Sequence, residues 1–232
     1  MTFPRALSKL AQLLSSSGIV TAAGGGTGLS APGTSGNVLT SDGTGWVSSP
    51  PAGGGGGGLV PIQTITTAAN QTNITFSSIP QTYKALVLRI AGRCNAGNTG
   101  GGTIGQVCAQ VNGNTVATDY AASGAYNSVT TYSISGTLAG AFIGEVPWSG
   151  DYAYGRGVIE ATMPSYTDTT FNKVWLTRWY IDNVGAVRHG QGIGLLGPGA
   201  SAAKTAAVTQ LDLIIPSSYW INGATATLYG IA

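Results

Sequence analysis

The chain has 232 residues, of which 43% are hydrophobic, only 8% are charged and 37 are glycine, and its net charge is +2. So small a charge excludes the basic surface by which proteins usually bind nucleic acid, and no uncharged apolar run reaches the roughly 18 residues that predict a membrane-spanning helix. One histidine and two cysteines leave no cluster for a metal site, so we expect no metal and no cofactor.

Residues 4–15 predict a short helix with one apolar stripe. Leu7, Leu10 and Leu14 recur at spacings of three and four residues. Because a lone helix of this length is marginal in water, the stripe needs a partner. We expect residues 1–23 to form an attachment segment that packs on copies of itself or docks on a larger assembly. The alternative is a helix that folds back on its own body.

Residues 24–59 have the composition of a linker. Glycine, serine, threonine, alanine and proline dominate this segment, and Asp42 is its only charged residue. Such a segment buries too little apolar surface to offset the entropy of ordering it. It is therefore predicted to connect the N-terminal segment to the rest of the chain.

From residue 60 to residue 232 the chain is predicted to form an all-β domain. Glycine and proline punctuate short runs of β-branched and aromatic residues, with no helical period. The predicted strands are 64–67, 72–76, 85–91, 104–111, 129–135, 139–146, 152–162, 171–181, 193–196, 207–215 and 225–231. About ten strands in a domain of this length predict a β-sandwich or jelly roll.

Alternation along the strands predicts the core, and turn residues predict a hairpin. Asn112-Gly113 is a hairpin signal between two predicted strands. On the strand 171–181, Trp175 and Trp179 share one face and Tyr180 lies on the other. The predicted core residues are Val87, Val158, Trp175, Leu211, Leu213 and Leu228.

Few residues of the chain could support catalysis. Glu145 and Asp151 could meet across a turn as a carboxylate pair, but surface acids without a catalytic role are the favoured interpretation. No nucleophile motif accompanies His189, the only histidine. We therefore expect no enzyme activity, and we expect Cys94 and Cys108 to be buried free thiols.

The loop around residues 147–155 is the candidate binding site. Trp148, Tyr152 and Tyr154 stand close together there, beside Asp151. Exposed aromatic rings next to a carboxylate can stack on sugar rings, so these four residues form a candidate glycan-binding site. The alternative, which we favour for the chain's aromatic residues as a group, is that they fill the core or a seam between subunits.

Three stretches of sequence resemble phage tail-fibre and related virion appendage proteins. The linker GGGTGLSAPGTSGNVLTSDGTGW is similar to the segment that precedes a C-terminal β domain in those proteins. The stretch FSSIPQTY, followed by LVLRI, is similar to the opening of that domain, and ATATLYGI is similar to its ending. The resemblance covers the linker and both ends of the β domain, and it transfers no ligand residues.

This resemblance implies a non-enzymatic protein of the virion, usually a homotrimer. The N-terminus would attach to other virion proteins of the tail, baseplate or capsid, and the β-sandwich would be displayed for recognition of host-surface glycans. The alternative is a capsid-decorating or head-fibre protein without a receptor role. No nucleic-acid partner and no membrane insertion are expected.

Overall fold

The computed structural model describes residues 19–20, 26–29, 37–49, 58–95, 104–127, 130–135, 139–150, 155–183, 186–197 and 205–232. The chain divides into two compact units, Met1–Gly56 and Gly57–Ala232. The predicted helix over residues 4–15, with Leu7, Leu10 and Leu14, lies outside the described residues, so it stays a prediction.

The first unit contains a β-hairpin within the predicted linker. Strands β1 (Val38–Ser41) and β2 (Trp46–Ser49) pair antiparallel. In the turn between them, Asp42 Oδ1 accepts hydrogen bonds from the backbone N–H groups of Thr44 at 2.9 Å and Gly45 at 2.7 Å. These bonds hold the pKa of Asp42 below its ordinary value. Composition predicts no strand here, and the hairpin forms because its loop supplies its own hydrogen bonds without a buried core.

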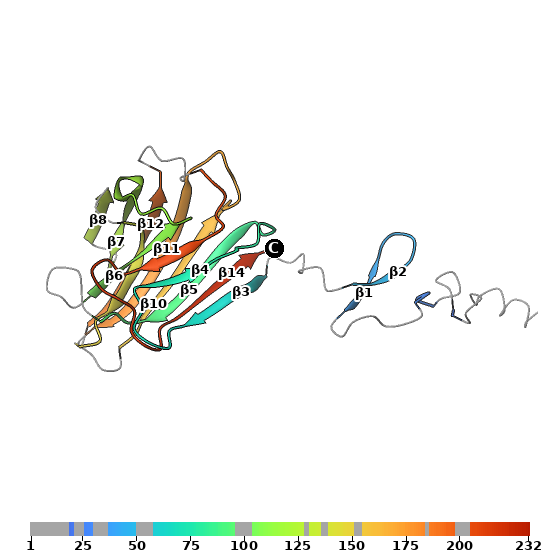
Figure 1. Cartoon of the computed structure of the whole chain (residues 1–232), viewed down its shortest axis with the longest axis horizontal. Coiled ribbons are helices and arrows are strands. Elements are labelled where there is room, and N and C mark those ends of the chain that lie inside the picture. The colour runs from blue at the N-terminus through green and yellow to red at the C-terminus, as the bar shows by residue number, and fades with distance from the viewer. Residues whose placement is uncertain are drawn as a thin grey trace, which may run out of the picture. The chain divides into compact units, whose positions relative to one another are not determined.

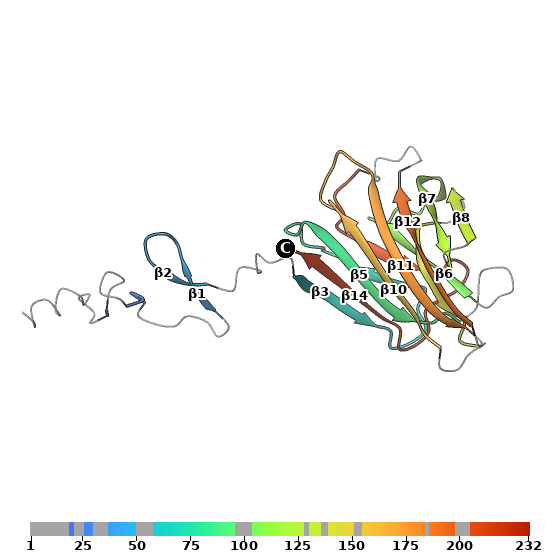
Figure 2. The ribbon, with the colours of Figure 1, turned by 180° about the vertical axis from the view of Figure 1, so that it is seen from behind.

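The second unit is all-β, as predicted, and consists of two antiparallel sheets (Figures 1 and 2). The large sheet has eight strands in the order β3-β14-β5-β10-β11-β12-β7-β8, and the small sheet has four in the order β4-β13-β6-β9. The strands are β3 (Leu59–Thr66), β4 (Asn73–Phe76), β5 (Ala85–Gly92), β6 (Ile104–Val111), β7 (Tyr120–Tyr126), β8 (Thr130–Ser135), β9 (Ala141–Pro147), β10 (Gly157–Pro164), β11 (Lys173–Asn183), β12 (Ala186–Leu196), β13 (Leu211–Ile214) and β14 (Thr225–Ile231).

The two sheets pack face to face as a β-sandwich. Strand β9 of the small sheet lies against β10, β11 and β12 of the large sheet. The hydrophobic core fills the space between the sheets and includes the buried rings of Trp175, Trp179 and Phe142. This arrangement leaves the other face of the large sheet outside the core.

Five of the six predicted core residues are buried. Val87, Trp175, Leu211, Leu213 and Leu228 are each at most 5% exposed. The prediction for Val158 is wrong, because its side chain is 50% exposed. Its strand alternates in the opposite phase and directs Ile159, Ala161 and Met163 into the core.

The Asn112-Gly113 turn is present, but it does not close a hairpin between neighbouring strands. Both residues have the positive φ values, 52° and 69°, of such a turn. However, β6 belongs to the small sheet and the next strand, β7, belongs to the large one, so this connection crosses between sheets. The Asn112 side chain instead bonds the segment before β13, accepting from the N–H groups of Thr209 and Gln210.

Candidate functional site

The outer face of the large sheet presents a regular array of side chains. Because paired residues of antiparallel strands lie side by side on one face, β10, β11 and β12 together form rows across the sheet. Three neighbouring rows are Val158–Tyr180–His189, Glu160–Arg178–Gln191 and Thr162–Leu176–Ile193. The array combines apolar, charged and hydrogen-bonding side chains within one surface.

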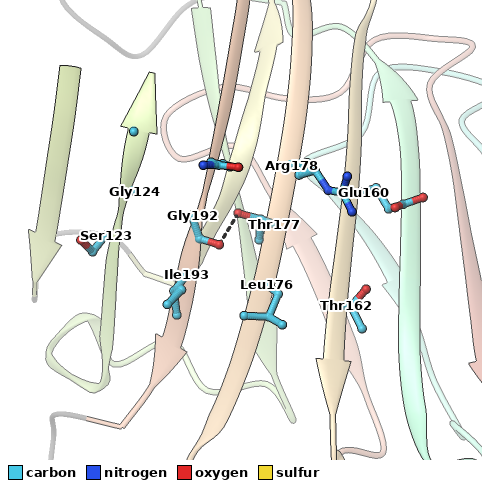
Figure 3. A pocket seen from close by; sticks show the side chains of 11 residues that line it. Ser123, Gly124, Glu160, Thr162, Leu176, Thr177, Arg178, Gly192 and Ile193 are labelled. Atoms are coloured by element: carbon cyan, nitrogen blue, oxygen red, sulfur yellow. Dashed lines mark hydrogen bonds between the residues drawn. The ribbon is translucent and has the colours of Figure 1, made fainter. Parts of the chain in front are cut away.

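An open groove crosses this face (Figure 3). Its volume is about 780 Å³, and its lining comes from four neighbouring strands, β7, β10, β11 and β12. The β7 side is built from the small residues Ser123, Gly124 and Ala125. The remaining lining residues are Glu160, Thr162, Leu176, Thr177, Arg178, Gln191, Gly192 and Ile193.

The charged side chains in and beside the groove carry a net positive charge. Glu160 Oε2 lies 2.8 Å from Arg89 Nε on the neighbouring strand β5, and both side chains are partly exposed. Arg178 extends from β11 toward strand β10 (Figure 3), and no described carboxylate lies within 4.0 Å of its nitrogens. Together with Arg89, Glu160 and Arg178 therefore carry one net positive charge, and that charge lies on Arg178 because Arg89 and Glu160 are paired.

Several large apolar side chains on this face are exposed. Leu176, Tyr180 and Ile193 have about half of their surface accessible, at 51%, 55% and 48%. The Tyr180 ring stacks on the His189 ring, with 6.1 Å between their centroids. Exposed apolar side chains that gather on one face, among polar ones, are typical of a surface that binds something.

The groove has the chemistry of a binding site for a ligand that is partly apolar and partly hydrogen-bonding. Leu176 and Ile193 offer apolar contact. Arg178 and Gln191 donate hydrogen bonds, and the Gln191 carbonyl accepts them. A few placed polar groups among apolar ones are the usual composition of small-molecule sites.

A second cluster of polar side chains lies on the other side of the same sheet, within the sandwich. A β-bulge at Ile143 shifts the pairing of β9 with β6, so that Gly144 pairs with Val107 while Phe142 pairs with Cys108. Without the extra residue, Phe142 and Glu145 would point to opposite faces, since they are three positions apart. Because of the bulge, Phe142 and Glu145 both face Trp179. The Phe142 ring contacts the Trp179 ring edge-on, with 5.3 Å between the ring centroids.

Glu145 is the centre of this cluster. It is 1% exposed and forms an ion pair with Arg188, whose Nε lies 3.2 Å from Glu145 Oε2. The Arg188 guanidinium in turn lies 4.2 Å from the centre of the Tyr126 ring. Burial raises the pKa of Glu145 above its ordinary value, although the neighbouring charge of Arg188 opposes the rise.

Of the four predicted glycan-binding residues, the structure describes only Trp148. Its indole is partly buried and packs against the core. Asp151, Tyr152 and Tyr154 lie outside the described residues, so the loop site stays a prediction. For Glu145, the interpretation as a surface acid is wrong, because the bulge turns it into the sandwich.

Sequence reasoning did not find the groove residues Arg178, Gln191, Leu176 and Ile193. Leu176 and Arg178 could have been found, because the alternation that places Trp175 and Trp179 inside also places these two residues outside. Gln191 lies in the first part of β12, which was not predicted as a strand, whereas Ile193 begins the predicted strand 193–196.

The remaining predictions on reactive groups concern the thiols. Cys94 and Cys108 are both free and buried, which confirms the expectation. Burial raises the pKa of the Cys108 thiol, so it is a poor nucleophile. Among the described residues, no three His, Cys, Asp or Glu side chains form a group that could hold a metal ion, and no helix is long and apolar enough to span a membrane.

The chain matches no known protein-family model and no curated protein. Among solved structures, it is similar to the PL-14 alginate lyase from the marine organism Aplysia kurodai, at 10% sequence identity and a TM-score of 0.24. The match covers 84% of this chain and 87% of the lyase. A likeness this weak does not transfer any residue role or activity to the present chain.

Proposed function

We propose that the chain is a non-enzymatic virion appendage protein of a bacteriophage that recognises a host-surface glycan. The observation that carries the glycan part is the groove on the outer face of the large sheet, with apolar and hydrogen-bonding side chains side by side. The virion part is supported by the resemblance of the linker and both ends of the β domain to phage tail-fibre and related virion appendage proteins.

The groove offers the two kinds of contact that a sugar needs. A sugar ring has an apolar face and a rim of hydroxyl groups, so it needs apolar contact and hydrogen bonds together. Leu176, Ile193 and Gln191 offer both within one surface on regular strands. Trp148, by contrast, has part of its ring already packed against the core.

In this proposal the protein acts as a homotrimer within the virion. The N-terminal segment, through Leu7, Leu10 and Leu14, joins the three chains or attaches them to proteins of the tail, baseplate or capsid. The β-sandwich is displayed to the host surface. Enzyme activity is not part of the proposal, because the one carboxylate in the groove, Glu160, is paired with Arg89.

One observation favours a second candidate, a capsid-decorating or head-fibre protein without a receptor role. The exposed apolar residues Val158, Leu176, Tyr180, Val187 and Ile193 all lie on the large sheet, and three of them lie outside the groove or at its margin. A surface of this kind would also suit burial against a neighbouring virion protein.

Glycan binding by the purified full chain tests the first candidate. On a glycan array and in a host-cell adsorption assay, we expect the wild-type protein to bind, and the double substitution of the lining residues Leu176→Ala and Ile193→Ala to weaken binding about tenfold or more. Val187→Ala is the matched control, because Val187 is 72% exposed on the same sheet but does not line the groove.

Three results distinguish the candidates. Loss of binding with Trp148→Ala and Tyr152→Ala, but not with the groove variant, would move the site to the predicted loop. Wild-type protein that binds no glycan and no host cell, yet binds purified phage particles through the large sheet, would favour the capsid-decorating role. Absence of all three interactions would contradict both candidates.

A further inference from the structure

The charged row in the groove identifies the class of glycan. On the outer face, Arg178 lies between Glu160 on β10 and Gln191 on β12. Glu160 is engaged at 2.8 Å by Arg89, whose guanidinium is also held 5.6 Å from the centre of the Tyr229 ring. Arg89 and Glu160 therefore form a local pair, and Arg178 is left with a net positive charge to be compensated.

Apolar neighbours make this uncompensated charge more effective. Leu176 and Tyr180 stand two residues before and after Arg178 on the same face of β11, and both are about half exposed. A ligand that covers these side chains would exclude water from the guanidinium, which strengthens its attraction for an anion. A guanidinium also presents parallel N–H groups that match the two oxygens of a carboxylate.

We propose that the groove binds a carboxylated saccharide, such as a uronic-acid oligosaccharide, with its carboxylate on Arg178. The sugar ring lies over Leu176 and Ile193, and its hydroxyl groups bond Gln191 and Thr162. This inference rests on the proposed glycan-binding function and specifies its ligand. A second copy of the chain is the competing occupant of this face, and the test below includes it.

The test compares two probes that share their sugar rings and differ in charge. Tetragalacturonate and its methyl ester have the same sugar rings, but the ester lacks the carboxylate charge. By titration calorimetry on the full chain at low salt, we expect the acid to bind about tenfold or more tightly than the ester. Arg178→Gln should remove this preference and leave ester binding within about twofold, whereas Arg178→Lys should keep part of it.

Arg156→Gln is the matched control, because Arg156 is an exposed arginine that does not line the groove. It removes the same charge from the chain and should leave the preference for the acid unchanged. Unchanged melting temperatures of all variants would show that lost binding does not reflect unfolding.

The outcomes separate this inference from the function on which it rests. Equal binding of acid and ester, with loss of both in the Leu176→Ala and Ile193→Ala variant, would overturn the inference and leave glycan binding intact. Absence of binding to these probes and to every glycan on the array would overturn both. If Arg178→Gln changed the oligomeric state measured by light scattering, the groove would be an interface between copies and the inference would be wrong.

Discussion

At the scale of single residues, the packing around Trp179 depends on the small size of its neighbour Gly190. Gly190 pairs with Trp179 across β11 and β12, and a Cβ at this position would lie 2.1 Å from Trp179 Cζ2. Trp179 cannot yield easily, because its buried ring also meets Phe142 and Tyr126 edge-on. The indole thus fills the space that the missing side chain leaves.

Gly190→Ala should therefore destabilise the β-sandwich. Forcing a methyl group into a packed core typically costs about 1–3 kcal/mol, and we expect the upper part of this range because the clash is with a rigid ring. Urea denaturation measures the loss. Gln191→Ala, the next residue on the same strand but exposed to solvent, should change stability by less than about 0.5 kcal/mol. Similar values for both variants would contradict this packing.

At the scale of elements, the bulge in β9 couples the two sheets through a buried charge. Glu145 comes from the small sheet, whereas Arg188, Tyr126 and Trp179 come from β12, β7 and β11 of the large one. A buried ion pair of this kind contributes little net stability, since desolvation offsets its Coulombic attraction. Its protonation nevertheless links the stability of the sandwich to pH.

The pKa of Glu145 is raised in the folded protein above its ordinary 4.5. The folded state then binds the proton more tightly than the unfolded state, so this residue's contribution to stability is present at low pH and is lost as the pH rises from 4.5 through the folded pKa. In urea denaturation across this range, the stability of the wild type relative to Glu145→Gln should fall as the pH rises.

The difference in stability between the wild type and Glu145→Gln isolates this residue. All other titrating groups are present in both proteins, so their contributions cancel in the difference. A difference that stays constant, or that grows in favour of the wild type with rising pH, would contradict the raised pKa. Aspartates with lowered pKa values, such as Asp168, act in the opposite direction and affect both proteins equally.

Strand prediction succeeded or failed according to side-chain type. The strands β5, β11 and β14 are rich in β-branched, leucine or aromatic residues and were predicted near their observed positions. Strand β7, with the sequence YAASGAY, and the first part of β12, AVRHGQG, were missed. Alanine, serine and glycine have low intrinsic strand preference, so these segments become strands only through pairing with neighbours distant in the sequence.

At the scale of the whole molecule, assembly remains the central prediction. The low charge of the chain gives little electrostatic repulsion between copies, which favours a surface that is partly covered by copies or partners. The leucine stripe of the predicted helix 4–15 also favours assembly, since a short amphipathic helix is stable only when its apolar face is covered.

The purified full chain should therefore be a trimer in solution, as measured by size-exclusion chromatography with light scattering. Replacing Leu7, Leu10 and Leu14 together by serine should yield smaller species, because the stripe loses its apolar contact area. Gln12→Ser, on the same segment but outside the stripe, should leave the trimer intact. A monomeric wild-type protein at micromolar concentration would contradict the assembly.

The sequence by itself determined the all-β class, the buried thiols and the alternation that separates Trp175 and Trp179 from Tyr180, because these follow from local composition and the two-residue period of a strand. Only the tertiary structure decided which phase of β10 faces inward, placing Ile159 rather than Val158 in the core. It also decided that Arg178 on β11 pairs with Gln191 on β12, and that a bulge turns Glu145 toward Trp179. Strand order, register and bulges depend on pairing between segments far apart in the chain, and no local pattern encodes that pairing.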